Sequence, residues 1–166
     1  FLYFLDKQGD VSRELDDGPM KGKPNPNCAV VWYTPSAVPA DAPRVEVGGK
    51  KKRDLLRDDR DYYFGRTISS VTVHDGLVYA AELGGFLFCF DAQTGKLYWA
   101  DGQLGQVMGQ PLWVDGKVYV ADNPGNVQVY AHGKAKKRLA KIECDVPIRT
   151  GLVFANGTLY LTTDTT

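Results

Sequence analysis

Cysteine and histidine are both scarce in this sequence, and the few that occur are far apart. The three cysteines are Cys28, Cys89 and Cys144, and no Cys-x-x-Cys pair is present. This spacing excludes the common zinc patterns, a haem-attachment motif and a disulfide framework. The cysteines are therefore predicted to be small side chains packed within strands.

An excess of either charge is also missing, because 20 basic residues balance 20 acidic ones. Long-range attraction to nucleic acid or to anionic lipid is therefore not encoded in the net charge. No apolar run is long enough to span a membrane. The chain has neither a starting methionine nor a signal peptide, and Phe1 opens within an apolar run, which favours a fragment or a processed chain.

Glycine and tyrosine, in contrast, are abundant, at 18 and nine residues, and several recur at a fixed period. The segments Asp75–Tyr79, Asp115–Tyr119 and Asn156–Tyr160 share one pattern, and their tyrosines are 40 and 41 residues apart. Asp-Gly or Asn-Gly between apolar residues predicts a tight hairpin, and a period of about 40 residues is typical of a four-stranded propeller blade. The predicted fold is therefore all-β, a β-propeller of four-stranded antiparallel blades. The repeated turn glycines are Gly76, Gly116 and Gly157.

The repeat divides the chain into about three blade equivalents. The predicted segments are the last two strands of a blade at 1–33, an insertion at 34–63, full blades at 64–106 and 107–148, and the start of a further blade at 149–166. Residues 9–27 are expected to form a loop, 34–63 a second irregular stretch and 53–60 a helical turn. Since such propellers have about six to eight blades, either the rest of the wheel lies outside this sequence or several chains complete it. A fragment is favoured.

The stretch Asp91–Trp99, DAQTGKLYW, resembles the signature of PQQ-like (pyrroloquinoline-quinone-like) propeller repeats, Asp-Ala-x-Thr-Gly-Lys-x-x-Trp. Its signature residues are Asp91, Thr94, Gly95 and Trp99. Asp and Thr side chains can bond turn backbone, glycine supplies a positive φ, and the tryptophan ring packs between blades. The signature is therefore interpreted as a folding device and not as a cofactor site. The second blade departs from it, because Ala131–Arg138 has another sequence and no tryptophan follows.

The resemblance implies a non-catalytic scaffold that binds protein partners, or the remaining blades of a larger propeller, in the periplasm or outside the cell. The charged insertion at 34–63 is the candidate contact surface, and no cofactor is expected. The alternative is a fragment of a PQQ-dependent quinoprotein dehydrogenase, which needs the quinone, a calcium ion and an Asp base. Enzymes of that family tend to carry an adjacent Cys-Cys pair, so the isolated cysteines favour the scaffold.

No catalytic, cofactor-binding or metal-binding residue is assigned from the sequence. Five residues near the expected starts of first strands are candidates for channel lining or partner contact, namely Arg66, Ser69, Ser70, Arg149 and Thr150. The serines lie in no Gly-x-Ser-x-Gly elbow, which favours channel lining over a hydrolase triad. The guanidinium groups can meet an anionic ligand or form ordinary ion pairs.

Three further polar features are interpreted as surface structure. His74 and His132 are expected to be solvent-exposed turn residues, with a metal site that includes Asp75 as the alternative. The segment Asp122–Asn126 lacks the terminal glutamate of a calcium loop and is predicted to be a turn. The basic run Lys50–Arg53 is assigned to a solvated loop, because acidic residues follow it closely.

Overall fold

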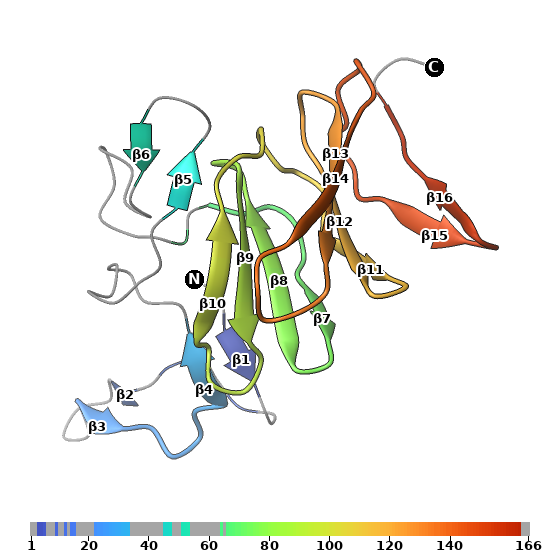
Figure 1. Cartoon of the computed structure of the whole chain (residues 1–166). Coiled ribbons are helices and arrows are strands. Elements are labelled where there is room, and N and C mark those ends of the chain that lie inside the picture. Colours follow the sequence, from blue (N-terminus) through green and yellow to red (C-terminus); the bar gives the residue numbers. More distant parts are fainter. Residues whose placement is uncertain are drawn as a thin grey trace.

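A computed structural model describes most of the chain from residue 64 onward and separate short segments before it (Figure 1). The described residues are 3–5, 9, 12, 14–15, 22–33, 45–47, 51–53, 64 and 66–163. Every regular element within these ranges is a β-strand. The described part contains no helix with the length and hydropathy of a transmembrane span.

Two complete four-stranded antiparallel sheets form the centre of the structure (Figure 1). The first full blade consists of β7 (Thr72–His74), β8 (Leu77–Glu82), β9 (Phe86–Asp91) and β10 (Leu97–Asp101). The second full blade consists of β11 (Leu112–Val114), β12 (Lys117–Ala121), β13 (Asn126–Ala131) and β14 (Arg138–Glu143). Each is a meander in which neighbours in sequence pair with one another. The predicted all-β fold with four-stranded antiparallel blades is confirmed.

Two-stranded sheets lie before and after the full blades. Strand β1 (Tyr3–Leu5) pairs with β4 (Val30–Tyr33), and β15 (Val153–Ala155) pairs with β16 (Thr158–Tyr160). Two smaller pairs were not predicted: β2 (Glu14–Leu15) with β3 (Lys23–Pro24), and β5 (Val45–Val47) with β6 (Lys51–Arg53). The expectation that 9–27 and 34–63 are irregular throughout is therefore wrong at these strands. A helical turn was expected at 53–60. Residue 53 is the last residue of β6, and residues 54–60 lie outside the described residues.

The repeated hairpins have the backbone that their sequences predict. Asp75 and Gly76 have φ values of 44° and 72°, and the equivalent pair Asp115 and Gly116 has 50° and 68°. Positive φ at both central residues is the type I′ geometry, which matches the twist of the two strands that it joins. Within each full blade, the turn between the third and fourth strands is tied to this hairpin by a backbone bond, Ala92 N to Gly76 O at 2.8 Å in the first and His132 N to Gly116 O at 2.9 Å in the second. Both turns of a blade therefore lie at the same end of its sheet, here called the turn end.

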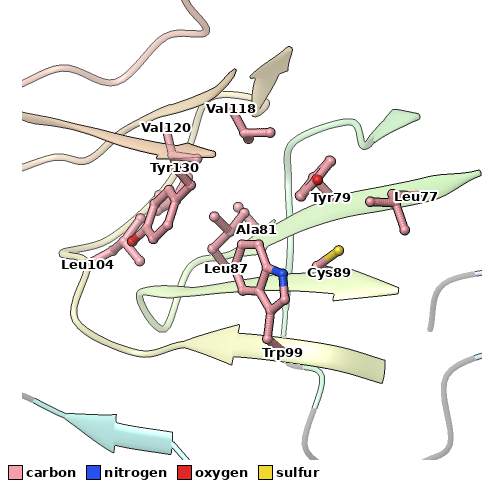
Figure 2. Close-up of a cluster of buried hydrophobic side chains, with 11 residues drawn as sticks. Leu77, Tyr79, Ala81, Leu87, Cys89, Trp99, Leu104, Val118, Val120 and Tyr130 are labelled. Carbon is pink, nitrogen blue, oxygen red and sulfur yellow. The ribbon is translucent and has the colours of Figure 1, made fainter. Parts of the chain in front are cut away.

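The core lies between the blades as well as within them. All six residues of β8 are buried, because this strand has a neighbour on each side and a packed layer on each face. One buried cluster combines side chains of β8, β9 and β10 with Val118, Val120 and Tyr130 of the second full blade (Figure 2). Burial of apolar surface contributes about 25 cal/mol per Å², so this shared cluster stabilises the blades as a pair.

Candidate functional site

The signature turn of the first full blade is closed by its own side chains. Asp91 Oδ1 accepts hydrogen bonds from Gln93 N at 3.0 Å, from Thr94 N at 2.9 Å and from Thr94 Oγ1 at 2.9 Å. Its other oxygen, Oδ2, accepts the Tyr98 hydroxyl at 2.8 Å. The bond from Tyr98, followed by those from Thr94, lowers the pKa of Asp91 to about 2. This carboxylate is thus engaged in holding the turn.

Gly95 fits the same turn for two physical reasons. Its φ is 71°, a region that side chains with a Cβ rarely adopt. A Cβ at this position would also lie 2.7 Å from ring atoms of Trp32, which comes from β4. The turn therefore packs directly against the sheet that precedes the first full blade.

Two tryptophans link successive sheets by the same hydrogen bond. Trp99 Nε1 donates to the Gly133 carbonyl of the second full blade at 3.0 Å. Trp32 Nε1 donates in the same way to the Ala92 carbonyl of the first full blade at 2.8 Å. The Trp99 ring also stacks on Tyr130, with centroids 5.6 Å apart, in the cluster of Figure 2. Each indole thus anchors its own sheet to the turn of the next.

The five residues predicted to line a channel or contact a partner lie at the end of the blades opposite the turn end, in two separate groups. Ser69 Oγ lies 3.2 Å from Thr67 Oγ1, and the Arg66 carbonyl accepts Leu83 N at 2.9 Å. Arg149 Nε donates to Asn123 Oδ1 at 3.1 Å, and Thr150 Oγ1 donates to the Thr162 carbonyl at 3.5 Å. Ser70 is exposed. Channel lining or partner contact by these five residues stays a prediction.

At the turn end, the structure brings together two histidines that the sequence placed on separate exposed turns. His74 Nε2 lies 3.3 Å from Asp75 Oδ2, and His132 Nε2 lies 4.0 Å from the same oxygen. The two imidazole centroids are 5.4 Å apart. The side chain of His132 is only 17% exposed and that of His74 is 32% exposed. The expectation of two unconnected, solvent-exposed histidines is therefore wrong.

Two aromatic residues that the sequence reasoning did not single out hold these rings. The Tyr79 hydroxyl lies 2.9 Å from His132 Nδ1 and accepts the backbone N–H of Gly133 at 3.0 Å. Burial raises the pKa of Tyr79 well above its usual range, so the hydroxyl keeps its proton. The Trp113 ring stacks on His74, with centroids 3.3 Å apart. The repeat could have indicated that the two histidines lie close together. His74 precedes the hairpin turn of the first full blade, and His132 lies in a turn at the same end of the second full blade.

The remaining nucleophile of this region is inert. Burial raises the pKa of the Cys89 thiol to about 12, and its side chain is inaccessible within the shared cluster. Among the described residues, no group of three or more His, Cys, Asp or Glu side chains could hold a metal ion. The arrangement at the turn end is thus an open cluster of two imidazoles and one carboxylate between two blades.

The fold and its repeat define the class of protein as a β-propeller built of PQQ-like repeats. A family model described as outer membrane protein assembly factor BamB (PQQ_2) matches residues 29–150, and the chain belongs to this family. Among curated proteins, the chain is similar to tetrathionate hydrolase of Acidithiobacillus ferrooxidans, with 38% identity over 76 residues. That match covers 42% of this chain and 15% of the hydrolase.

The chain is also similar to parts of solved structures. The crystal structure of BamB from Moraxella catarrhalis superposes with a TM-score of 0.52 and 19% identity, over 58% of this chain and 29% of that one. A europium-containing methanol dehydrogenase gives a TM-score of 0.39 and 23% identity, over 43% of this chain and 14% of the enzyme. The chain thus spans less than a third of the length of each of these relatives.

Proposed function

We propose that this chain is part of a non-catalytic propeller scaffold that supports protein–protein assembly in the bacterial envelope, in the periplasm or outside the cell. The observation that carries the proposal is that the signature residues make structural contacts. Asp91 closes a turn with both of its carboxylate oxygens, and Trp99 ties one blade to the next. Residues engaged in this way make a rigid frame, and rigid frames present loops to partners. The family description, an outer membrane protein assembly factor, supports the same role.

The insertion at 34–63 is the proposed contact surface. Strand β5 of its hairpin lies near β10, the outermost strand of the first full blade. The second full blade has no such segment among the described residues, and its outermost strand, β14, is exposed along its whole length. A partner that binds the insertion is therefore held beside one particular blade.

An enzyme is the second candidate, and the relative named tetrathionate hydrolase is the observation that favours it. Under this reading the chain is a piece of a propeller enzyme, either a hydrolase of that kind or a quinoprotein dehydrogenase that uses PQQ and calcium. The match covers only 15% of the hydrolase, so the residues that perform its reaction need not lie in the shared part.

Site-specific photo-crosslinking in the source cells tests the scaffold. A photoreactive amino acid is placed in the full-length protein at position 51, within β6 of the insertion, and, as the control, at position 117 in β12 of the second full blade. We expect crosslinking from position 51 to capture a single envelope protein, identified by mass spectrometry. Crosslinking from position 117 should not capture that protein. Equal capture from both positions would overturn the assignment of the contact surface. Turnover of tetrathionate, or quinone-dependent dye reduction by the purified full-length protein, would replace the scaffold by an enzyme.

A further inference from the structure

The outer edge of the second full blade is a strand with a free side. In the described part of the chain, β14 pairs with β13 alone, and Ala140 to Glu143 follow one regular register with Val129 to Asn126. Roughly half of the N–H and C=O groups of an edge strand point away from its neighbour, where a further strand can pair with them. All six residues of β14 are exposed. The strand therefore offers backbone groups and side chains to an incoming segment.

The corresponding edge strand of the first full blade has different surroundings. Strand β5 of the insertion lies near this strand, β10. Three of the five residues of β10 are buried, namely Trp99, Ala100 and Asp101. The repeat makes β10 and β14 equivalent, so the full exposure of β14 distinguishes the second blade from the first.

Positive charge is concentrated along β14 and the turn that leads into it. Residues 134–143 contain five basic residues and one acidic residue, in a chain whose formal net charge is zero, and all of them are exposed. Lys136 and Lys141 have carboxylate partners at 3.8 and 2.6 Å. Arg138 donates instead to two neutral glutamine side chains, at 3.0 and 3.3 Å. This edge therefore keeps an excess of positive charge that an acidic segment would neutralise.

Exposed aliphatic side chains accompany the basic ones. Leu139 and Ile142 are 45% and 48% exposed. Ile142 lies opposite Val127, and its neighbour Lys141 projects from the other face of the sheet. A strand paired with β14 would thus meet basic side chains on one face and an aliphatic side chain on the other. A sequence that alternates acidic and aliphatic residues is complementary to both faces.

We infer that β14 binds an acidic, extended segment of a partner protein, which adds a fifth strand to the second full blade. The backbone groups of the free edge supply the pairing, and the basic residues select the partner. A second copy of the same edge is excluded as the occupant, because it would place basic residues opposite basic residues. This surface is separate from the insertion at 34–63, so the inference goes beyond the proposed scaffold function and does not depend on it.

Fluorescence anisotropy of labelled peptides with the full-length protein tests the inference. The probe is a peptide as long as β14 in which glutamate alternates with valine. In one comparison peptide lysine replaces each glutamate, which reverses the charge. In the other proline replaces each valine, which keeps the charge and removes N–H donors at alternate positions. We expect the glutamate–valine peptide to bind at least about tenfold more tightly than either comparison peptide, and more weakly as salt is added.

A charge reversal at the edge has a matched control in the first full blade. Lys137 and Lys96 are both exposed, and their carbonyls accept equivalent backbone N–H groups, from Ala131 at 2.9 Å and from Asp91 at 2.8 Å. We expect Lys137→Glu to weaken binding of the glutamate–valine peptide by at least about fivefold and to strengthen binding of the lysine–valine peptide. Lys96→Glu should leave both affinities unchanged.

Hydrogen exchange separates strand addition from attraction between charges alone. With the glutamate–valine peptide bound, backbone amides of β14 should exchange more slowly, and those of β10 should exchange at their original rates. Unchanged exchange in β14, or no binding at millimolar peptide, would overturn the inference. Equal loss of affinity in Lys137→Glu and Lys96→Glu would do the same, as would equally tight binding of the proline peptide or of a single-stranded DNA oligonucleotide.

Discussion

Replacing Trp99 by phenylalanine removes one hydrogen bond between blades and keeps an aromatic ring in the shared cluster. The indole is 4% exposed, and its Nε1 donates to the Gly133 carbonyl at 3.0 Å. Gly133 is only partly buried, and a carbonyl that is buried and loses its partner costs about 1–3 kcal/mol. The Cys89 thiol, 3.8 Å from the same carbonyl, is too weak a donor to replace the indole. The lost ring volume adds a packing term, so we expect Trp99→Phe to lower the free energy of unfolding by about 2–4 kcal/mol.

Trp113→Phe is the control, because Trp113 also lies between the two full blades but does not make this hydrogen bond. Trp113 Nε1 is buried and has no hydrogen-bond partner in the structure. Its removal therefore relieves an unsatisfied donor, and we expect a loss of less than about 1 kcal/mol. Urea unfolding followed by circular dichroism measures both variants without relying on tryptophan fluorescence. Equal losses in Trp99→Phe and Trp113→Phe would refute the view that the hydrogen bond to Gly133 holds the blades together.

Three further predictions concern the signature turn and the core. Gly95→Ala should destabilise the protein by at least about 1 kcal/mol more than Gly116→Ala, since both have positive φ but only the first Cβ would meet the Trp32 ring; equal losses in urea unfolding would contradict this. The pKa of Asp91 is lowered to about 2 in the folded protein, whereas its value in the unfolded chain is near 4. Its contribution to stability is therefore fully present above about pH 4 and is lost as the pH falls through about 2. The difference in stability between wild type and Asp91→Asn should shrink over that range. Cys89 should be the slowest of the three cysteines to react with a thiol reagent at neutral pH, because its pKa is about 12 and its thiol is buried; labelling followed by mass spectrometry of peptides checks this.

The repeat made the central blades predictable from sequence, because turn chemistry and strand alternation are local. The repeated turns at Gly76 and Gly116 join β7 to β8 and β11 to β12, as the sequence predicts. The hairpin of β5 and β6 was missed because its three-residue strands alternate too briefly to stand out from a stretch rich in proline and glycine. A two-glycine signal, Gly48-Gly49, was present between them.

The cluster of His74 and His132 was not predictable in the same way. Sequence separation says nothing about distance when two turns belong to different blades, and the deciding fact is the packing of one sheet on the next. The repeat alone does place both turns at the turn end, as the bonds from Ala92 to Gly76 and from His132 to Gly116 show. A sequence argument that follows the meander strand by strand could therefore have brought the two histidines to one end, but not to within reach of one carboxylate.

The second full blade shows which part of the repeat signature the fold requires. Its turn has no equivalent of Asp91 or Thr94, yet the Gly133 carbonyl accepts Trp99 Nε1 just as the Ala92 carbonyl accepts Trp32 Nε1. The connection between blades thus depends on a backbone oxygen, which any turn sequence supplies. The side chain at position 132 is therefore free of the signature's constraint, and the histidine there packs between the blades instead, with its Nδ1 2.9 Å from the Tyr79 hydroxyl.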